Sequence, residues 1–232
     1  GDGARPIVVF KILMNTPIKE RLFAHIAKND TGKGFSEEAF AELGRLVEAI
    51  RAETVYPAPM DTLRHVEGRW ETLFAHFGAR HSAGKPKVHD SNLKVQSFNA
   101  FPPVPVRIER LCQEISEHGN GYKNVVDFTA ADGVTRGVIV VRGRFNGEPD
   151  NRQRFSVDFY RVELWPGEGT DAAGLRKALG FAASESLSED LKPLRFHSDV
   201  VYLDADTRIN IGSLGGLYVL RRLDEEPVSI RL

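Results

Sequence analysis

A change in hydrophobic periodicity near Gly68 constrains the fold of this chain more than any other feature. Before this residue the apolar side chains recur at helical spacing, and after it they alternate with polar ones. Residues 154–164 show the alternation clearly, because Phe155 and Phe159 fall on one face of an extended chain and Tyr160 falls on the other. Alternation of this kind predicts strands of an antiparallel sheet, with one face buried and one face solvated.

Many short strands, separated by frequent turns, fill the rest of the chain. This organisation predicts a barrel or a sandwich, and the meandering order together with a single aromatic face favours a closed barrel. The sequence thus predicts a mainly β protein that consists of an antiparallel β barrel. With the N-terminal helical segment included, the fold is α+β. The predicted strands are 69–77, 93–98, 122–129, 134–144, 154–164, 200–203, 208–211 and 217–223, with 107–115 ambiguous between strand and helix and 171–181 a short helix or lid-like excursion.

Two helices precede the strands. Thr16 is a suitable N-cap for the first, and Ser36 caps a second helix that begins with two glutamates. The Pro-Ala-Pro step at residues 57–59 ends the second helix, because proline cannot continue it. We therefore expect residues 1–56 to form a helical lead packed on the barrel, and residues 57–232 to form the barrel domain. The apolar stripes are Ile18, Leu22 and Ile26 in the first helix, and Phe40, Leu43, Leu46, Val47 and Ile50 in the second.

The charge balance limits the partners of the chain. Lys and Arg together number 31 and Asp and Glu 32, for a net charge of -1. A protein that neutralises many phosphates normally has a basic excess, so we expect no nucleic-acid partner. A small basic patch that contacts a membrane is still compatible with this balance.

The longest apolar run near the N-terminus, residues 6–14, is far shorter than the roughly 20 residues of a membrane span. The chain begins Gly1-Asp2-Gly3 without a methionine, which indicates an expression remnant or a removed leader.

No group of residues in the sequence assembles a convincing catalytic or metal site. Cys112, the single cysteine, excludes an internal disulfide and fits a buried structural role better than that of a nucleophile. His76, His81 and His89 flank a loop rich in Gly and Lys at irregular spacing, which is typical of solvated side chains rather than of a zinc site. We therefore predict no enzymatic activity, no metal and no cofactor.

The acidic residues near the C-terminus have two interpretations. Asp204, Asp206 and Arg208 would lie on one strand face, at positions i, i+2 and i+4. A structural ion pair that fixes the final hairpin is favoured over a ligand site, since charges in barrels are usually paired. The two aspartates alone are a weak signal for a divalent metal.

Residues 201–220 form the most specific motif in the chain. This order of residues resembles the C-terminal signature of the plastid lipid-associated protein, or fibrillin, family. Ile211 departs from the pattern, since the family commonly has a second arginine there. The motif reads tyrosine-leucine-aspartate at 202–204, arginine-isoleucine at 208–209, a glycine turn at 212–216 and then an aromatic-valine-leucine strand from Tyr218.

Two further blocks of the sequence match the same family in order. Gly68-Arg69-Trp70 is similar to its glycine-x-tryptophan opening strand, and residues 113–115 (Gln-Glu-Ile) with 122–126 (Tyr-Lys-Asn-Val-Val) resemble its middle block. The resemblance spans roughly residues 36 to 222. It implies a lipocalin-like β barrel that associates with lipids, isoprenoid compounds or membrane-derived lipid bodies, and no enzymatic activity.

From the resemblance and the aromatic strands we expect a hydrophobic ligand, such as a lipid, isoprenoid, quinone or carotenoid, in or at the mouth of the barrel. An arginine from the last strand, Arg221 or Arg222, can stack on the indole of Trp70. The implied location is cytoplasmic or peripheral to a membrane for a bacterial chain, and a plastid lipid body or thylakoid for a photosynthetic eukaryote. The sequence does not fix an oligomeric state. The candidate ligand-binding residues are Trp70, Phe74, Phe155, Phe159, Tyr160, Tyr202, Arg208 and Tyr218.

Two other functions stay open. One is structural: the barrel is filled by its own aromatic side chains, and the N-terminal helices contact lipid or a protein partner. The other, which is the least favoured, is an enzyme that acts on an apolar substrate with Asp204, Asp206 or His197 as the acid or base. Such a role requires at least two of these groups to share a pocket.

Overall fold

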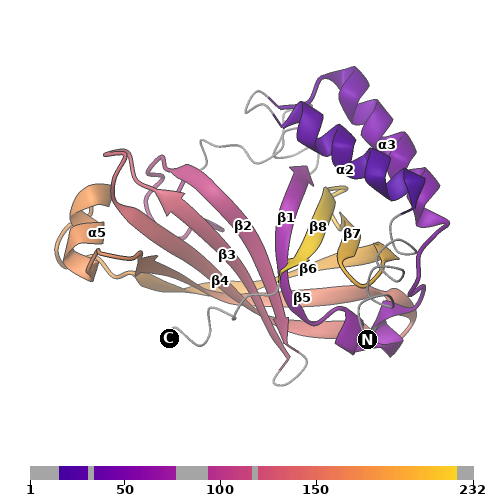
Figure 1. The fold of residues 1–232 in the computed structure, drawn as a ribbon. Helices are drawn as coiled ribbons and strands as arrows, with labels where there is room; N and C mark the ends of the chain where they lie inside the picture. The colour runs from indigo at the N-terminus through magenta and orange to yellow at the C-terminus, as the bar shows by residue number, and fades with distance from the viewer. Residues whose placement is uncertain (1–15, 31–33, 77–93, 117–119, 224–232) are drawn as a thin grey trace, which may run out of the picture.

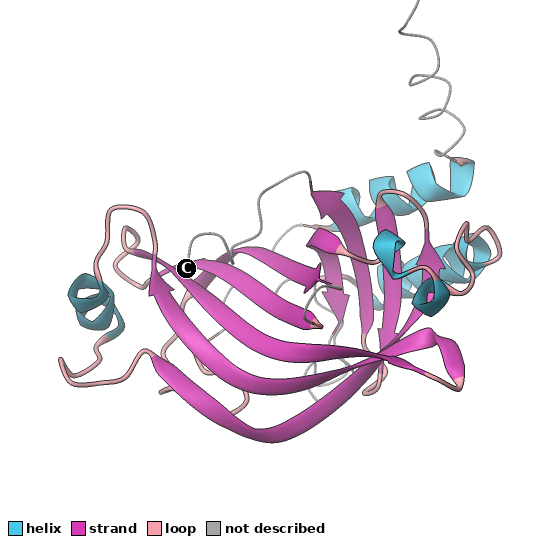
Figure 2. Ribbon diagram, turned by 90° about the horizontal axis from the view of Figure 1, so that it is seen from below, coloured by secondary structure: helices cyan, strands magenta, loops and turns pink. Residues whose placement is uncertain are grey.

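Eight antiparallel strands close into a barrel (Figure 1, Figure 2). The computed structural model describes residues 16–30, 34–76, 94–116 and 120–223. Each strand pairs with the next along the chain, and the first also pairs with the last, so the predicted barrel is confirmed. The strands are β1 (Gly68–His76), β2 (Arg107–Ser116), β3 (Gly121–Thr129), β4 (Arg136–Glu148), β5 (Asn151–Pro166), β6 (Ser188–Leu203), β7 (Thr207–Gly212) and β8 (Leu217–Leu223). The helices are α2 (Pro17–Asn29), α3 (Glu37–Arg51) and α5 (Ala172–Leu179), with 3₁₀ turns η1 (Pro59–Asp61) and η2 (Leu63–His65).

The observed strands differ from the predicted ones at two places. The ambiguous residues 107–115 belong to strand β2. Strand β6 begins at Ser188, well before the predicted start at residue 200. Its first half contains Pro193, and both of its faces there are half buried or exposed, so no alternation of apolar and polar residues marks this part as a strand.

Residues 94–106, here named the 94–106 segment, do not form the strand predicted at 93–98. This segment makes isolated bridges only, one of which joins Lys94 to Pro105. Three prolines in the segment lack the amide hydrogen that a strand ladder requires. The ring of Phe101 lies 6.4 Å from that of Phe181, just beyond α5, so the segment lies at the α5 end of the barrel.

Helices α2 and α3 pack against the outer face of the barrel, beside β1, β7 and β8 (Figure 1). Both begin at the expected caps, because Thr16 and Ser36 each accept a hydrogen bond from an amide of the first turn. Their apolar stripes cover side chains that point outward from four strands, so this part of the barrel wall is apolar on both faces. None of the described helices is long and apolar enough to span a membrane. The buried cluster contains Leu22, Ile26, Phe35, Leu43, Leu46, Val47, Ile50, Phe74, Val201, Tyr202, Ile209 and Val219.

A buried ion pair joins α2 to the turn between β6 and β7. The side chain of Lys19 is 1% exposed, and its Nζ lies 2.8 Å from Asp204 Oδ2 and 2.5 Å from Asp206 Oδ1. Tyr202 donates its hydroxyl hydrogen to the same carboxylate of Asp204 at 2.5 Å. This network fixes the helical pair to the barrel by charge as well as by apolar contact.

Asp204 and Asp206 do form an ion pair, but their partner is Lys19, so the prediction that Arg208 is the partner is wrong. The prediction assumed an extended chain, but residues 204–207 form a tight turn in which Asp204 Oδ1 accepts from the amides of residues 206 and 207. The turn directs both carboxylates toward α2, whereas Arg208 points into the barrel.

Replacement of Lys19 tests the importance of this ion pair for stability. We expect Lys19→Met to lower the free energy of unfolding by about 3–5 kcal/mol, because it leaves Asp204 buried without a cation. Lys28→Met, at an exposed position of the same helix, should change it by less than about 0.5 kcal/mol. Chemical denaturation followed by circular dichroism measures both, and equal effects would contradict a specific role for Lys19.

The same network predicts sensitivity to acid. Burial acts to raise the pKa of Asp206, but hydrogen bonds from Lys19 and Thr207 outweigh it and hold the pKa below its ordinary value of 3.8. A carboxyl with a lowered pKa contributes stability above its unfolded-state pKa and loses it as the pH falls through the folded-state pKa. The free energy of unfolding should therefore decrease below about pH 4. This decrease should be shallower in Asp206→Asn, as measured by urea denaturation across the acid range.

Candidate ligand-binding site

Trp70 lies inside the barrel, near the start of strand β1. Its side chain is fully buried, and its Nε1 donates to the carbonyl oxygen of Val66 at 2.9 Å. Arg222 stands directly opposite Trp70 on β8, and its guanidinium carbon lies 4.3 Å from the indole centroid. Of the two arginines that the sequence offers, Arg222 therefore stacks on the ring. Arg221 is exposed and pairs with Glu71 at 3.0 Å.

A second arginine, Arg208 on β7, contacts the same indole. Its guanidinium carbon lies 5.0 Å from the ring centroid of Trp70 and 5.9 Å from that of Phe155, and its Nη2 donates to Gln113 Oε1 at 2.6 Å. The side chain is fully buried. Burial, together with the nearby positive charge of Arg222, lowers the pKa of Arg208 to about 10, so the group stays charged at neutral pH.

Polar atoms around Arg208 lack partners. Among the described residues, no acceptor lies within hydrogen-bond distance of its Nε or Nη1. The Oδ1 of Asn210, two residues further along β7, is also buried without a donor. More than nine in ten buried polar groups in proteins have a partner, either in the protein or in ordered water, so these atoms are exceptions that require a further partner.

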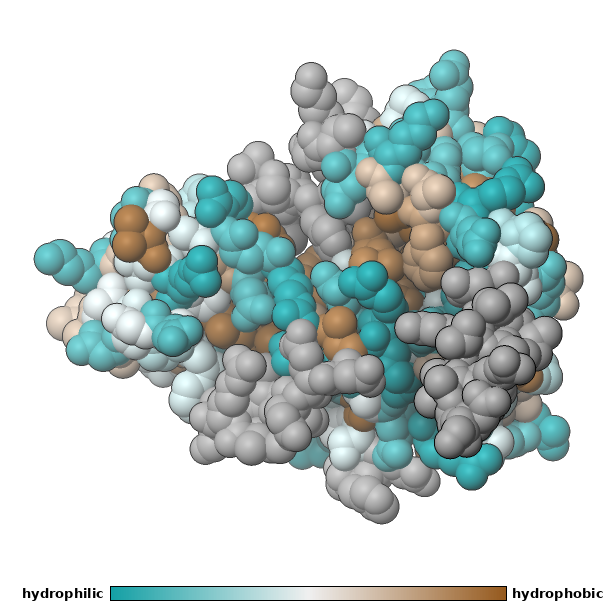
Figure 3. Space-filling view, in the orientation of Figure 1, coloured by the Kyte–Doolittle hydropathy of each residue, from teal (hydrophilic) through white to brown (hydrophobic). Residues whose placement is uncertain are grey.

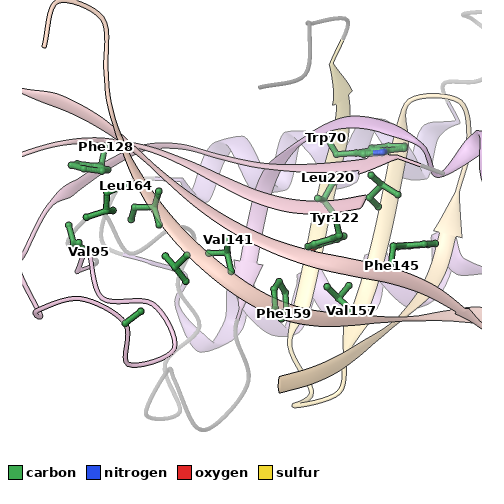
Figure 4. Packing of buried hydrophobic residues seen from close by; sticks show 14 of the residues in the cluster. Trp70, Val95, Tyr122, Phe128, Val141, Phe145, Val157, Phe159, Leu164 and Leu220 are labelled. Carbon is green, nitrogen blue, oxygen red and sulfur yellow. The ribbon is translucent and has the colours of Figure 1, made fainter. Parts of the chain in front are cut away.

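Aromatic side chains of β3 to β6 form a continuous wall inside the barrel, here named the aromatic wall. Figure 4 shows Tyr122, Phe145 and Phe159 on neighbouring strands, directed toward the interior. The ring centroids of Phe145 and Phe155 are 4.9 Å apart, those of Tyr122 and Phe159 5.8 Å, and those of Phe159 and Phe196 6.1 Å. Contacts at these separations are typical of packed aromatic pairs. Burial raises the pKa of Tyr122 well above its ordinary value, so its hydroxyl stays protonated.

The 94–106 segment covers the far end of this wall. The ring of Phe98 lies 5.1 Å from Phe159 and 5.8 Å from Phe196, yet 40% of the side chain is exposed. Phe98, Asn99 and Phe101 have φ of 49°, 65° and 67°, in the left-handed region that side chains other than glycine rarely adopt. Each such residue costs about 1–2 kcal/mol, so contacts with the aromatic wall must hold this segment in place.

The structure divides the candidate ligand-binding residues between two faces of the barrel. Trp70, Phe155, Phe159, Arg208 and Tyr218 belong to or contact the interior, and burial raises the pKa of Tyr218 to about 12. The other three lie outside the barrel. Phe74 and Tyr202 are beneath α2 and α3, and Tyr160 is on the outer surface, with the guanidinium carbon of Arg144 4.5 Å from its ring centroid.

The sequence analysis missed several residues of the interior. Tyr122 begins a strand that the sequence did predict, so its face assignment could have found it. Phe145 lies one residue beyond the predicted strand 134–144, and extending the alternation by that residue would have placed it inside. Gln113 and Phe98 gave no such signal, because the first lies on a strand whose type was ambiguous and the second in a segment without regular structure.

The residues considered for acid–base chemistry do not share a pocket. A polar cavity of about 410 Å³ is open to the outer surface beside β5 and β6, and its lining includes Ser156, Arg195 and His197 but neither Asp204 nor Asp206. Within the described residues, no three His, Cys, Asp or Glu side chains are placed to hold a metal.

Three histidines were considered for a zinc site. His76 is the last residue of β1, and burial lowers its pKa, whereas His81 and His89 lie outside the described residues.

Cys112 is buried on the outer side of β2, against Val125. Burial raises the pKa of its thiol, which therefore stays protonated at neutral pH. A protonated, buried thiol is a poor nucleophile, which is consistent with the structural role predicted for Cys112.

Replacement of each of the adjacent arginines on β8 tests the stacking arrangement at Trp70. The guanidinium of Arg222 donates to the backbone oxygens of His65, Glu67 and Ala205, which one ammonium group cannot reach in the same planar geometry. We expect Arg222→Lys to lower the free energy of unfolding by about 1–3 kcal/mol. Arg221→Lys should change it by less than about 0.5 kcal/mol. Thermal and urea denaturation measure the difference, and equal stability of the two variants would contradict the arrangement.

Comparison with known proteins places the chain in a family. A solved structure of a lipocalin-like protein from Bacteroides uniformis aligns with 68% of this chain and 99% of its own, at 10% identity and a TM-score of 0.31, a likeness too weak to support an inference. No curated protein matches the chain. The PAP_fibrillin family matches residues 16–221, which include α2, α3 and nearly all of the barrel. The chain therefore belongs to the PAP/fibrillin family.

Proposed function

We propose that this protein binds a hydrophobic small molecule or a lipid, held along the aromatic wall between Trp70 and the 94–106 segment. The observation that carries the proposal is the incomplete cover of this wall. The ring of Phe98 contacts those of Phe159 and Phe196 but is 40% exposed, so the wall continues from the interior of the barrel to its surface. Membership of the PAP/fibrillin family supports association with lipids or isoprenoid compounds.

The chemistry of the wall favours extended, apolar ligands. Its rings offer dispersion contacts and few hydrogen-bonding groups, so isoprenoid chains, quinones, carotenoids and acyl chains all suit it. Burial of each methylene group of such a chain contributes about 0.8 kcal/mol. A ligand can reach the wall if the 94–106 segment moves aside, and the left-handed residues of this segment reduce the cost of that movement.

A structural or interaction role is the second candidate, and one observation favours it. The aromatic side chains of the interior contact one another directly, as expected of a barrel filled by its own residues. The apolar stripes of α2 and α3 are buried against the barrel and cannot contact lipid in this arrangement. Partly buried apolar residues nevertheless reach the surface where these helices meet β1 and β8 (Figure 3), and this surface is where a membrane or protein partner would bind.

We propose no catalytic role. An acid–base mechanism requires at least two of His197, Asp204 and Asp206 in one pocket. Both carboxylates are bound to Lys19, outside the polar cavity that His197 lines. The proposed location follows from the ligand: the protein acts at or near a membrane surface or lipid body from which an apolar molecule is taken.

A neutral fluorescent probe tests the proposed function. N-phenyl-1-naphthylamine is apolar and uncharged, and we expect it to bind the full chain saturably, with an increase in fluorescence. Phe159→Ala should weaken this binding about tenfold, because it removes ring contacts from the wall, which corresponds to about 1.4 kcal/mol. Tyr160→Ala is the matched control, since the next residue of the same strand faces outward, and it should leave the affinity within about twofold.

The outcome distinguishes the two candidates. If the wild-type protein binds neither this probe nor any lipid extracted with it from the expression host, as measured by mass spectrometry, the proposed function is excluded. If it then floats with phospholipid vesicles in a density gradient, the interaction role is supported instead.

A further inference from the structure

A purely apolar ligand does not account for Arg208. Its charge lies inside the barrel, 0% exposed, and three of its N–H groups, one on Nε and two on Nη1, have no acceptor among the described residues. The one side chain that accepts from it, Gln113, is neutral. No carboxylate in the described part of the chain pairs with it.

This arrangement is costly unless a negative group completes it. A buried ion without a counterion loses its hydration, and the neighbouring charge of Arg222 adds repulsion. The faces of Trp70 and Phe155 attract the guanidinium, but a ring face does not replace the in-plane acceptors that its N–H groups require. A carboxylate has two acceptor oxygens and one negative charge, and it satisfies both requirements.

The aromatic wall leads from Arg208 to the surface. Phe155 lies 5.9 Å from the guanidinium carbon, Tyr122 lies 6.3 Å from Phe155, and Phe159 lies 5.8 Å from Tyr122. The exposed Phe98 follows at 5.1 Å from Phe159. The buried guanidinium of Arg208 therefore stands at the inner end of a continuous apolar path whose outer end is at the surface.

We propose that Arg208 binds the anionic end of an amphiphile, a carboxylate on a long apolar chain, with the chain extended along the aromatic wall. This inference rests on the proposed function and names the class of its ligand. A carboxylate suits the site better than a phosphate, because of the two guanidiniums that contact Trp70 only that of Arg208 has N–H groups without acceptors, while backbone oxygens accept from Arg222.

Three ligands with the same chain and different head groups test the proposal. The competitors are oleate, oleyl alcohol and methyl oleate, each displacing N-phenyl-1-naphthylamine from the full chain at pH 8. We expect oleate to bind at least tenfold more tightly than the two neutral compounds. Arg208→Gln should abolish the preference for oleate and still bind the neutral probe. Arg208→Lys should keep part of the preference for oleate. Arg221→Gln, which changes an exposed side chain, should keep all of the preference.

A second measurement uses only the wild-type protein, so it does not depend on whether a variant folds. Oleate labelled with carbon-13 at its carboxyl group, bound to the wild-type protein, should titrate with a pKa below that of the carboxyl group in vesicles, because the guanidinium favours the ionised form. Inorganic phosphate and acetate at millimolar concentration should not displace oleate, since they lack the chain.

The outcomes separate the two proposals. Saturable binding of the neutral probe with equal affinities for oleate and oleyl alcohol overturns the role of Arg208 and leaves the proposed function standing. Displacement of oleate by phosphate alone shows a site for free anions and overturns the amphiphile. Failure of the wild-type protein to bind the neutral probe or any lipid extracted with it from the expression host overturns the proposed function itself.

Discussion

The pairing of β1 with β8 is the constraint on which the rest of the structure depends. It closes the sheet, removes both free edges and creates an interior that side chains must fill. It also sets Trp70 directly opposite Arg222, so that the indole and the guanidinium meet across the closing seam. The backbone oxygens that Arg222 binds belong to the chain before β1 and to the turn before β7, so one side chain connects both sides of the seam.

Closure also gives the two faces of the barrel different roles near this seam. The inner face of β7 and β8 meets the indole, Arg208 and the aromatic wall, while the outer face meets the apolar stripes of α2 and α3. Ile209 and Arg208 are neighbours in sequence, yet one packs under a helix and the other is the charge of the interior. The helices thus keep water from the outer side of the strands that carry the candidate site.

The sequence predicted those parts of the structure that follow from local periodicity. Alternation assigned Phe155 and Phe159 to one face, and the two helix caps are where the side-chain chemistry placed them. It failed where tertiary contacts override local pattern. Asp204 and Asp206 lie in a turn, and their cation comes from a helix far away in sequence, so no spacing rule could identify Lys19. The 94–106 segment was misjudged because its extended-looking residues adopt left-handed geometry that only contact with the barrel stabilises.

The salt bridge between α2 and the β6–β7 turn has a consequence for the order of events during synthesis. Its two ends are 185 residues apart, and the helical hairpin emerges from the ribosome before any strand of the barrel exists. The hairpin therefore has no surface to cover until β6, β7 and β8 have been made, and contacts of such long sequence separation form slowly. For most of the time that the chain is being translated, the apolar stripes of the two helices therefore have no barrel surface to pack against.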